Sequence, residues 1–262
     1  MSEETTKRGQ AGFSLIEMII AMAITITITA VAASLLAQSM NLRTRNNERV
    51  DALADAQRAL NIMSREIADA GFNLNDNGIV AEDSVTDANG NSTIRIRSNL
   101  NKYNTALNPF DPGASVSLEA QRGIGTGNVG EDQGEDVKYF VHTAEDTNLL
   151  ARYDRYRIAG GSSTVLANRL NRLHIHYYAG KVTYNTAPGS DVMVNGALVR
   201  AGCDITDASL AEVSPSAATY VVIAVCVQQD AVGAPGSPGY QPATNVLLVS
   251  DVALRNSNLL IY

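Results

Sequence analysis

The segment Gly12-Phe13-Ser14-Leu15-Ile16-Glu17, together with the apolar run behind it, decides the fold of this chain. Residues 18–37 form a run of 20 residues without a charge. At about 1.5 Å per residue, a helix of that length spans roughly 30 Å, the thickness of the hydrocarbon core of a bilayer. Glu17 lies at the start of this helix, where a charge is costly in lipid and marks a functional residue.

A short polar leader, residues 1–12, precedes the segment and carries Lys7 and Arg8. Positive residues next to a membrane span stay on the cytoplasmic side. We therefore expect the leader to be cytoplasmic and the bulk of the chain to be translocated.

The segment resembles the class III signal of type IV pilins and pseudopilins. In that family a membrane peptidase cuts after the glycine, here Gly12, and the new terminal residue, here Phe13, is then methylated. The glutamate five residues after the cut, here Glu17, guides filament assembly. Two alternatives are a conventional secretory signal peptide, which keeps its apolar core short and free of acid, and an ordinary signal-anchor helix, which gives no reason for Glu17.

The helix is predicted to continue past the apolar run, because residues 38–70 contain no glycine and no proline. Apolar residues recur there at helical spacing, and Gly71 is well placed as the C-terminal cap. We expect one helix over 13–70, about 58 residues and roughly 87 Å if straight, with a membrane half at 13–37 and an amphipathic half at 38–70. The alternative is two helices with a break near Asn41 or Asn46-Asn47.

Residues 71–262 are predicted to form an exported, β-rich domain. Alternation and β-branched content indicate strands at 93–97, 115–119, 137–143, 150–158, 170–179, 192–199, 220–228 and 246–254. Turn-forming clusters separate them, which favours a mainly antiparallel sheet under the amphipathic half of the helix. The fold class is therefore α+β, and the resemblance implies a type IV pilin-like fold.

Later stretches resemble PilW-type minor pilins less specifically: the helix end around residues 58–72, the strand at 170–178 and the closing residues 252–256. J-type pseudopilins of type II secretion share much of this pattern. The resemblance implies as partners other pilin subunits, the prepilin peptidase and methyltransferase, and the inner membrane.

The chain is acidic, with a formal charge of -7, of which -6 falls in residues 71–262. Binding to DNA or anionic lipid needs a basic face, so no direct nucleic-acid binding is expected. The two cysteines, Cys203 and Cys226, could pair in an oxidising compartment. The alternative is a free Cys226 buried in its apolar strand.

No catalytic constellation is recognisable. His174 and His176 alternate on one predicted strand and face the same side as Tyr178, but no cysteine or carboxylate nearby completes a metal site, so we expect a polar, exposed strand face. We expect no enzyme, no metal and no cofactor.

The leading hypothesis is a minor pilin in the assembly, initiation or tip of a type IV pilus, first in the inner membrane and then at the cell surface. The alternatives are a J-like pseudopilin of a secretion system and a tip-displayed adhesin or DNA-uptake module. A binding module of that kind would need a basic or aromatic-rich patch, whereas aromatic residues make up only 5% of this chain.

Overall fold

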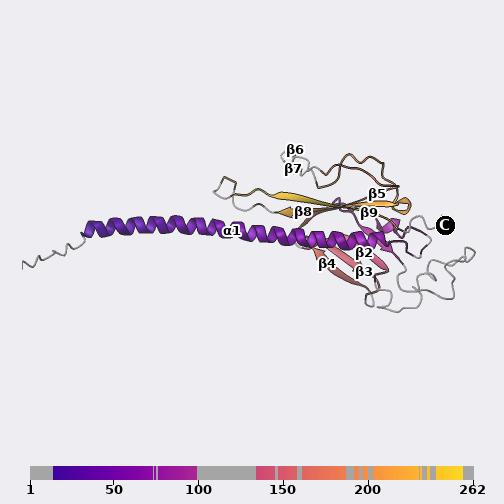
Figure 1. The fold of residues 1–262 in the computed structure, drawn as a ribbon, viewed down its shortest axis with the longest axis horizontal. Coiled ribbons are helices and arrows are strands. Elements are labelled where there is room, and N and C mark those ends of the chain that lie inside the picture. The colour runs from indigo at the N-terminus through magenta and orange to yellow at the C-terminus, as the bar shows by residue number, and fades with distance from the viewer. Residues whose placement is uncertain are drawn as a thin grey trace, which may run out of the picture. The chain divides into compact units, whose positions relative to one another are not determined.

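A computed structural model describes residues 14–72, 74, 76–98, 134–144, 147–157, 161–186, 192–194, 197–199, 203–229, 231, 235–236 and 240–255. The chain divides into two compact units, Met1–Glu48 and Arg49–Tyr262, each described by itself. A long, apolar N-terminal helix whose C-terminal part packs on antiparallel sheets gives an α+β layout like that of type IV pilins (Figure 1).

Helix α1, Leu15–Ala68, is continuous, so the predicted alternative of two helices is wrong. Its ends lie two residues inside the predicted ones. Gly71 follows it with φ +76°, a left-handed conformation that a Cβ atom disfavours. A Cβ atom on Gly71 would also lie 2.5 Å from the Asp76 carbonyl oxygen. The prediction that the helix ends at this glycine is confirmed.

Within the described residues the strands form three antiparallel sheets. The four-stranded sheet has the order β1-β2-β3-β4 and the three-stranded sheet the order β5-β8-β9, while β6 and β7 form a separate hairpin. Their bounds are β1 Ile94–Arg97, β2 Asp136–Ala144, β3 Thr147–Asp154, β4 Ser162–Ala167, β5 Leu170–Tyr178, β6 Val192–Val194, β7 Ala197–Val199, β8 Tyr220–Gln229 and β9 Thr244–Ala253.

The main core lies between the C-terminal part of α1 and both larger sheets. One stripe of the helix is buried there: Ala52, Ala56, Ala59, Leu60, Met63, Ile67 and Ala68. On β5 the odd-numbered residues Leu173, Ile175 and Tyr177 belong to this core, and on β8 so do Val221, Ile223 and Val225. Because side chains alternate across a strand, the even-numbered residues 172–178 of β5 and 220–226 of β8 face the other side of the sheet, while Leu170, before an irregularity in β5, joins the main core.

A buried polar network fixes the helix on the four-stranded sheet. The Tyr139 hydroxyl donates to Glu66, and Arg152 Nη2 lies 3.0 Å from Glu66 Oε1. Arg152 also pairs with Asp154, which is fully buried. Burial raises the pKa of Tyr139, and the neighbouring Glu66 carboxylate raises it further, so the phenol stays a donor. Charge-assisted bonds of this kind give the apolar contact a fixed register.

The open edge of β5 is closed by a polar segment rather than by a strand. Ser92 donates its N–H to the Leu173 carbonyl at 2.7 Å, and its hydroxyl oxygen accepts the N–H of Ile175 at 3.1 Å. Asn91 Oδ1 accepts the N–H of Leu173 at 3.3 Å. These bonds hold β5 in place, and β5 carries both histidines of interest.

Most predicted strands are confirmed within a few residues, with two exceptions. The strand predicted at 150–158 ends at Asp154, and the one predicted at 192–199 is the hairpin of β6 and β7. Strand β4 is not predicted, because its first two residues belong to the Gly-Gly-Ser-Ser cluster at 160–163, which indicates a turn. Its pairing with β3 supplies the hydrogen bonds that make it a strand. The strand predicted at 115–119 lies outside the described residues.

Replacing Glu66 by alanine should lower the free energy of unfolding by about 2–3 kcal/mol, because Tyr139 and Arg152 would lose a charged partner in a half-buried site. Urea unfolding of the full-length chain in detergent, followed by circular dichroism, measures this. Arg65→Ala, on the exposed neighbour, is the matched control and should change stability by less than about 0.5 kcal/mol. Equal losses in both variants would contradict a specific role of the network.

Candidate functional site

The described part of the N-terminal motif begins at Ser14, while Gly12 and Phe13 lie outside the described residues. Ser14 precedes the first helical residue, and its carbonyl accepts the N–H groups of Glu17 and Met18 at 3.0 and 3.2 Å. In return, Glu17 Oε2 accepts the N–H of Ser14 at 3.4 Å. This is one half of a capping box, and the Ser-x-x-Glu spacing in the sequence is the signal that could have revealed it.

Glu17 therefore has a structural role besides the predicted assembly role. Its carboxylate lies at the positive end of the helix dipole, which favours a negative charge there. Glu17 lies three residues after Ser14, within the first turn of α1.

The N-terminal part of α1 is apolar on every side, and its side chains from residue 14 to 37 are exposed. Among the described residues this is the one helix that is long and apolar enough to cross a membrane. An uncovered apolar surface on all sides needs lipid or other protein around it.

The hydroxyl groups within this part of the helix are satisfied locally. Thr25 and Thr29 donate to carbonyls four residues earlier, each at 2.7 Å, and Thr27 donates to the carbonyl of Ile24 at 2.8 Å. A threonine that bonds its own helix exposes little unsatisfied polarity, so these residues are compatible with an apolar environment.

Residues 7–37 match the family model of the prokaryotic N-terminal methylation motif. This match supports assigning the chain to the type IV pilin and pseudopilin family, whose members are processed by prepilin peptidase, assemble with other pilins and are structural rather than known enzymes. Together with the apolar helix, it fits a pilin anchored in the inner membrane that ends up in a surface pilus. No curated protein and no solved structure matches the chain.

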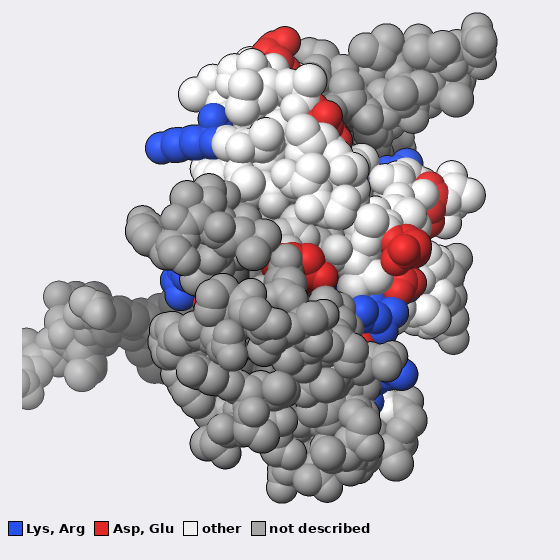
Figure 2. Space-filling view, turned by 90° about the vertical axis from the view of Figure 1, so that its right-hand side faces the viewer, with Lys and Arg blue, Asp and Glu red and all other residues white. Residues whose placement is uncertain are grey.

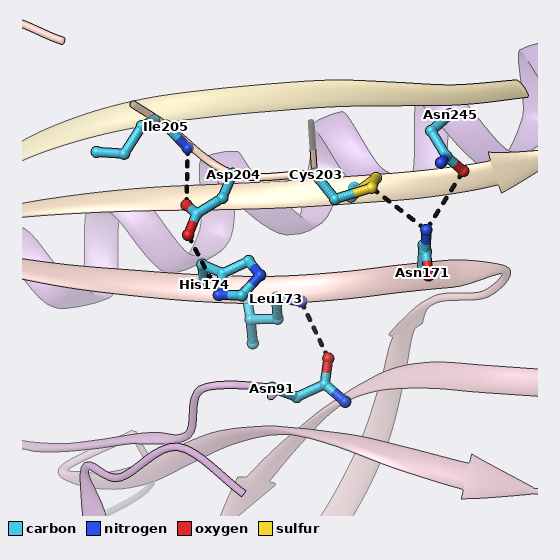
Figure 3. The surroundings of a disulfide bond; sticks show 9 residues. Asn91, Asn171, Leu173, His174, Cys203, Asp204, Ile205 and Asn245 are labelled. Atoms are coloured by element: carbon cyan, nitrogen blue, oxygen red, sulfur yellow. Dashed lines mark hydrogen bonds and ion pairs between the residues drawn. A yellow bond between two sulfur atoms is a disulfide. The ribbon is translucent and has the colours of Figure 1, made fainter. Parts of the chain in front are cut away.

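The second candidate site is the face of the three-stranded sheet that points away from α1. In the structure Cys203 and Cys226 form a disulfide, with their Cα atoms 5.2 Å apart (Figure 3). Cys226 lies on β8 and is fully buried, so the bond ties the chain around residue 203 to the centre of the sheet. Asn171 Nδ2 lies 3.3 Å from the Cys203 sulfur.

His174, His176 and Tyr178 share this face, with their rings stacked along β5. The expectation of an exposed face without a carboxylate is wrong. The side chains of His174 and His176 are only 23% and 15% exposed, and Asp204 lies between them, 3.5 Å from His174 Nδ1 and 2.7 Å from His176 Nε2. Glu212 lies 2.7 Å from His176 Nδ1.

Sequence reasoning missed Asp204 and Glu212 because they lie 28 and 36 residues from His176 in the chain. The sequence carries one signal for Asp204: it directly follows Cys203, so a disulfide between Cys203 and Cys226 would bring Asp204 next to β8. Among the described residues no group of three or more His, Cys, Asp or Glu side chains could hold a metal ion.

On the face drawn in Figure 2, acidic and basic side chains of the described residues are scattered among neutral ones. Among the described residues on this face, the basic side chains do not form one continuous patch. This face thus offers no support for the basic patch that a DNA-uptake module would need.

Removing the disulfide by the double change Cys203→Ser and Cys226→Ser should lower the free energy of unfolding by about 3 kcal/mol, from the entropy of the loop that it closes. Urea unfolding with and without reductant measures this. Reductant should bring the wild type to the level of the variant and leave the variant unchanged. Rapid alkylation of both thiols in the native, unreduced protein would show that the bridge is absent.

Proposed function

We propose that the protein is a minor pilin, most similar to the PilW type, that takes part in the assembly, initiation or tip structure of a type IV pilus. The observation that carries this proposal is the methylation motif at residues 7–37 followed directly by an uncovered apolar helix. A chain of 262 residues with a β-rich unit of this size supports a minor rather than a major subunit, since the major pilins of the family are usually smaller.

The proposed division of labour follows the chain. Residues 1–12 are the cytoplasmic leader, residues 13–37 enter the membrane and later the filament, and residues 38–70 connect to the exported domain of residues 71–262. Cleavage after Gly12 removes Lys7 and Arg8, which hold the N-terminus at the cytoplasmic face. The new amine at Phe13 is then free to pair with Glu17 of the same or a neighbouring subunit.

Mass spectrometry of the mature chain should show Phe13 at the N-terminus with one added methyl group. Gly12→Val should leave the leader attached, because a branched side chain would obstruct the peptidase at the cut. Thr5→Val, which places the same valine side chain within the leader but away from the cut, is the control and should be processed normally. An intact leader on the wild-type chain in its own host would refute the processing step.

Replacing Glu17 by glutamine separates its two roles. Glutamine can still cap the helix from this position, but it carries no charge to pair with the Phe13 amine. An amine that enters low dielectric without a charged partner is strongly disfavoured. Glu17→Gln and Glu17→Ala should therefore both be cleaved and inserted, while their incorporation into filaments falls at least about tenfold.

Immunoblots of sheared filaments against the membrane fraction measure this incorporation. Wild-type levels for Glu17→Gln and low levels for Glu17→Ala would show that Glu17 acts through capping alone. Co-purification of the detergent-extracted protein with pilins supports the pilus assignment, whereas co-purification with secretion components would favour the pseudopilus.

A further inference from the structure

Residues 203–213, here called the cover segment, run from the outer face of the three-stranded sheet, at Cys203 and Ile205, to the edge of β5, at Val213. Ile205 is buried there in a second small core with Tyr178, Tyr220, Val222 and Ala224. The segment is also held through its backbone, because Val213 donates its N–H to the Tyr177 carbonyl at 2.9 Å. At the other end, the disulfide of Cys203 fixes it to β8.

His176 holds the cover segment at two further points. Its Nε2 lies 2.7 Å from Asp204 Oδ1 and its Nδ1 lies 2.7 Å from Glu212 Oε1. An ionised carboxylate only accepts hydrogen bonds, and a neutral imidazole has a single N–H to donate. Both contacts can be hydrogen bonds only if His176 carries two protons and is a cation.

We propose that His176 is a pH-sensitive clasp: as a cation it holds both Asp204 and Glu212, and loss of one proton releases the Glu212 end of the cover segment. This inference concerns the exported unit and does not depend on the proposed pilin function.

The asymmetry between the two carboxylates decides which end opens. Asp204 keeps other partners, since its Oδ1 accepts the N–H of Ile205 at 2.7 Å, its Oδ2 lies 3.5 Å from His174, and its neighbour Cys203 is bonded to Cys226 (Figure 3). The side chain of Glu212 is 54% exposed. Among the described residues its one side-chain hydrogen bond is to His176.

The charged and titratable groups around the clasp come from both elements that pack here. On β5 they are Arg172, His174 and Tyr178; on the cover segment they are Asp204 and Glu212. The residues opposite His174 and His176 on β8, Ala224 and Val222, are apolar. Both histidines therefore contact the same carboxylate, Asp204, and β8 supplies no second charged group opposite them.

These neighbouring groups shift the pKa values of His174 and His176 in opposite directions. Burial lowers the pKa of His176, but the hydrogen bonds and charges of Asp204 and Glu212 outweigh it, so that pKa lies above its ordinary value of 6.5. Burial lowers the pKa of His174, and the charges of His176 and Arg172 add to this effect against the attraction of Asp204. One cation shared by two carboxylates is the arrangement that results.

The sign of the pH dependence follows. A group whose pKa is raised on folding contributes its full stabilisation below its unfolded pKa and loses it as the pH rises through the folded pKa. The clasp should thus be closed in mildly acidic solution and open in alkaline solution, with the transition above 6.5.

Hydrogen exchange measured by mass spectrometry on the full-length mature chain in detergent tests the clasp. At about pH 6 and about pH 9, with exchange rates corrected for intrinsic chemistry, protection of residues 210–213 should fall at least about tenfold at the higher pH, while Ile205, Thr206 and Ser209 keep their hydrogen bonds. NMR of the three histidines should place the pKa of His176 above 6.5 and show both ring nitrogens protonated below it.

Matched variants locate the effect. His176→Gln should show low protection of residues 210–213 at both pH values, and Glu212→Gln should lose the pH dependence and lower the pKa of His176. His174→Gln should keep the pH dependence, because His174 does not contact Glu212. Equal protection of the wild type at both pH values, a His176 pKa at or below 6.5, or an unchanged response in His176→Gln would each overturn the clasp.

Discussion

Burial of a single narrow stripe of α1 against both larger sheets is the contact on which the rest of the Arg49–Tyr262 unit depends. The stripe combines small residues, Ala52, Ala56 and Ala59, with the larger Leu60 and Met63, all of them buried. Apolar burial is strong but has no direction. The orientation of the helix on the sheet is fixed by the network of Glu66, Tyr139 and Arg152. Its bonds can form in only one register of the helix on the sheet.

The same helix serves a second environment in its N-terminal part. The side chains of residues 15–37 form an exposed apolar surface on every side of the helix, and the threonine hydroxyls donate to carbonyls of the same helix. Such a surface has no preferred face, so it can lie in lipid and later pack against several neighbouring helices. Glu17 is the exception, since it is an acidic residue at the helix start whose carboxylate caps the helix by accepting the N–H of Ser14.

On the outer face of the three-stranded sheet, a small apolar core is held by ties of different kinds. The disulfide is covalent, the contacts of His176 are ionic, and Tyr184 and Tyr220 both donate to Asp251. The disulfide depends on the absence of reductant, and under our proposal the contacts of His176 depend on pH. The outer layer of the Arg49–Tyr262 unit is thus attached by contacts of a different chemical kind from those of the apolar main core.

The sequence by itself determined the features that depend on local order along the chain. The motif from Gly12 to Glu17 and the apolar run behind it indicated the family, the absence of glycine and proline up to Gly71 indicated one helix, and alternation located most strands. These signals are local because membrane insertion, helix formation and strand pleating depend on near neighbours.

Only the tertiary structure decided the contacts between distant segments. Alternation placed His174 and His176 on one face of a strand, but the pairing of β5 with β8 and the return of the chain at Cys203 brought Asp204 and Glu212 to them. Strand β4 likewise exists because β3 pairs with it. The physical reason is that a hydrogen bond or an ion pair requires proximity in space, and proximity between residues 28 to 36 positions apart follows from the packing of the whole unit.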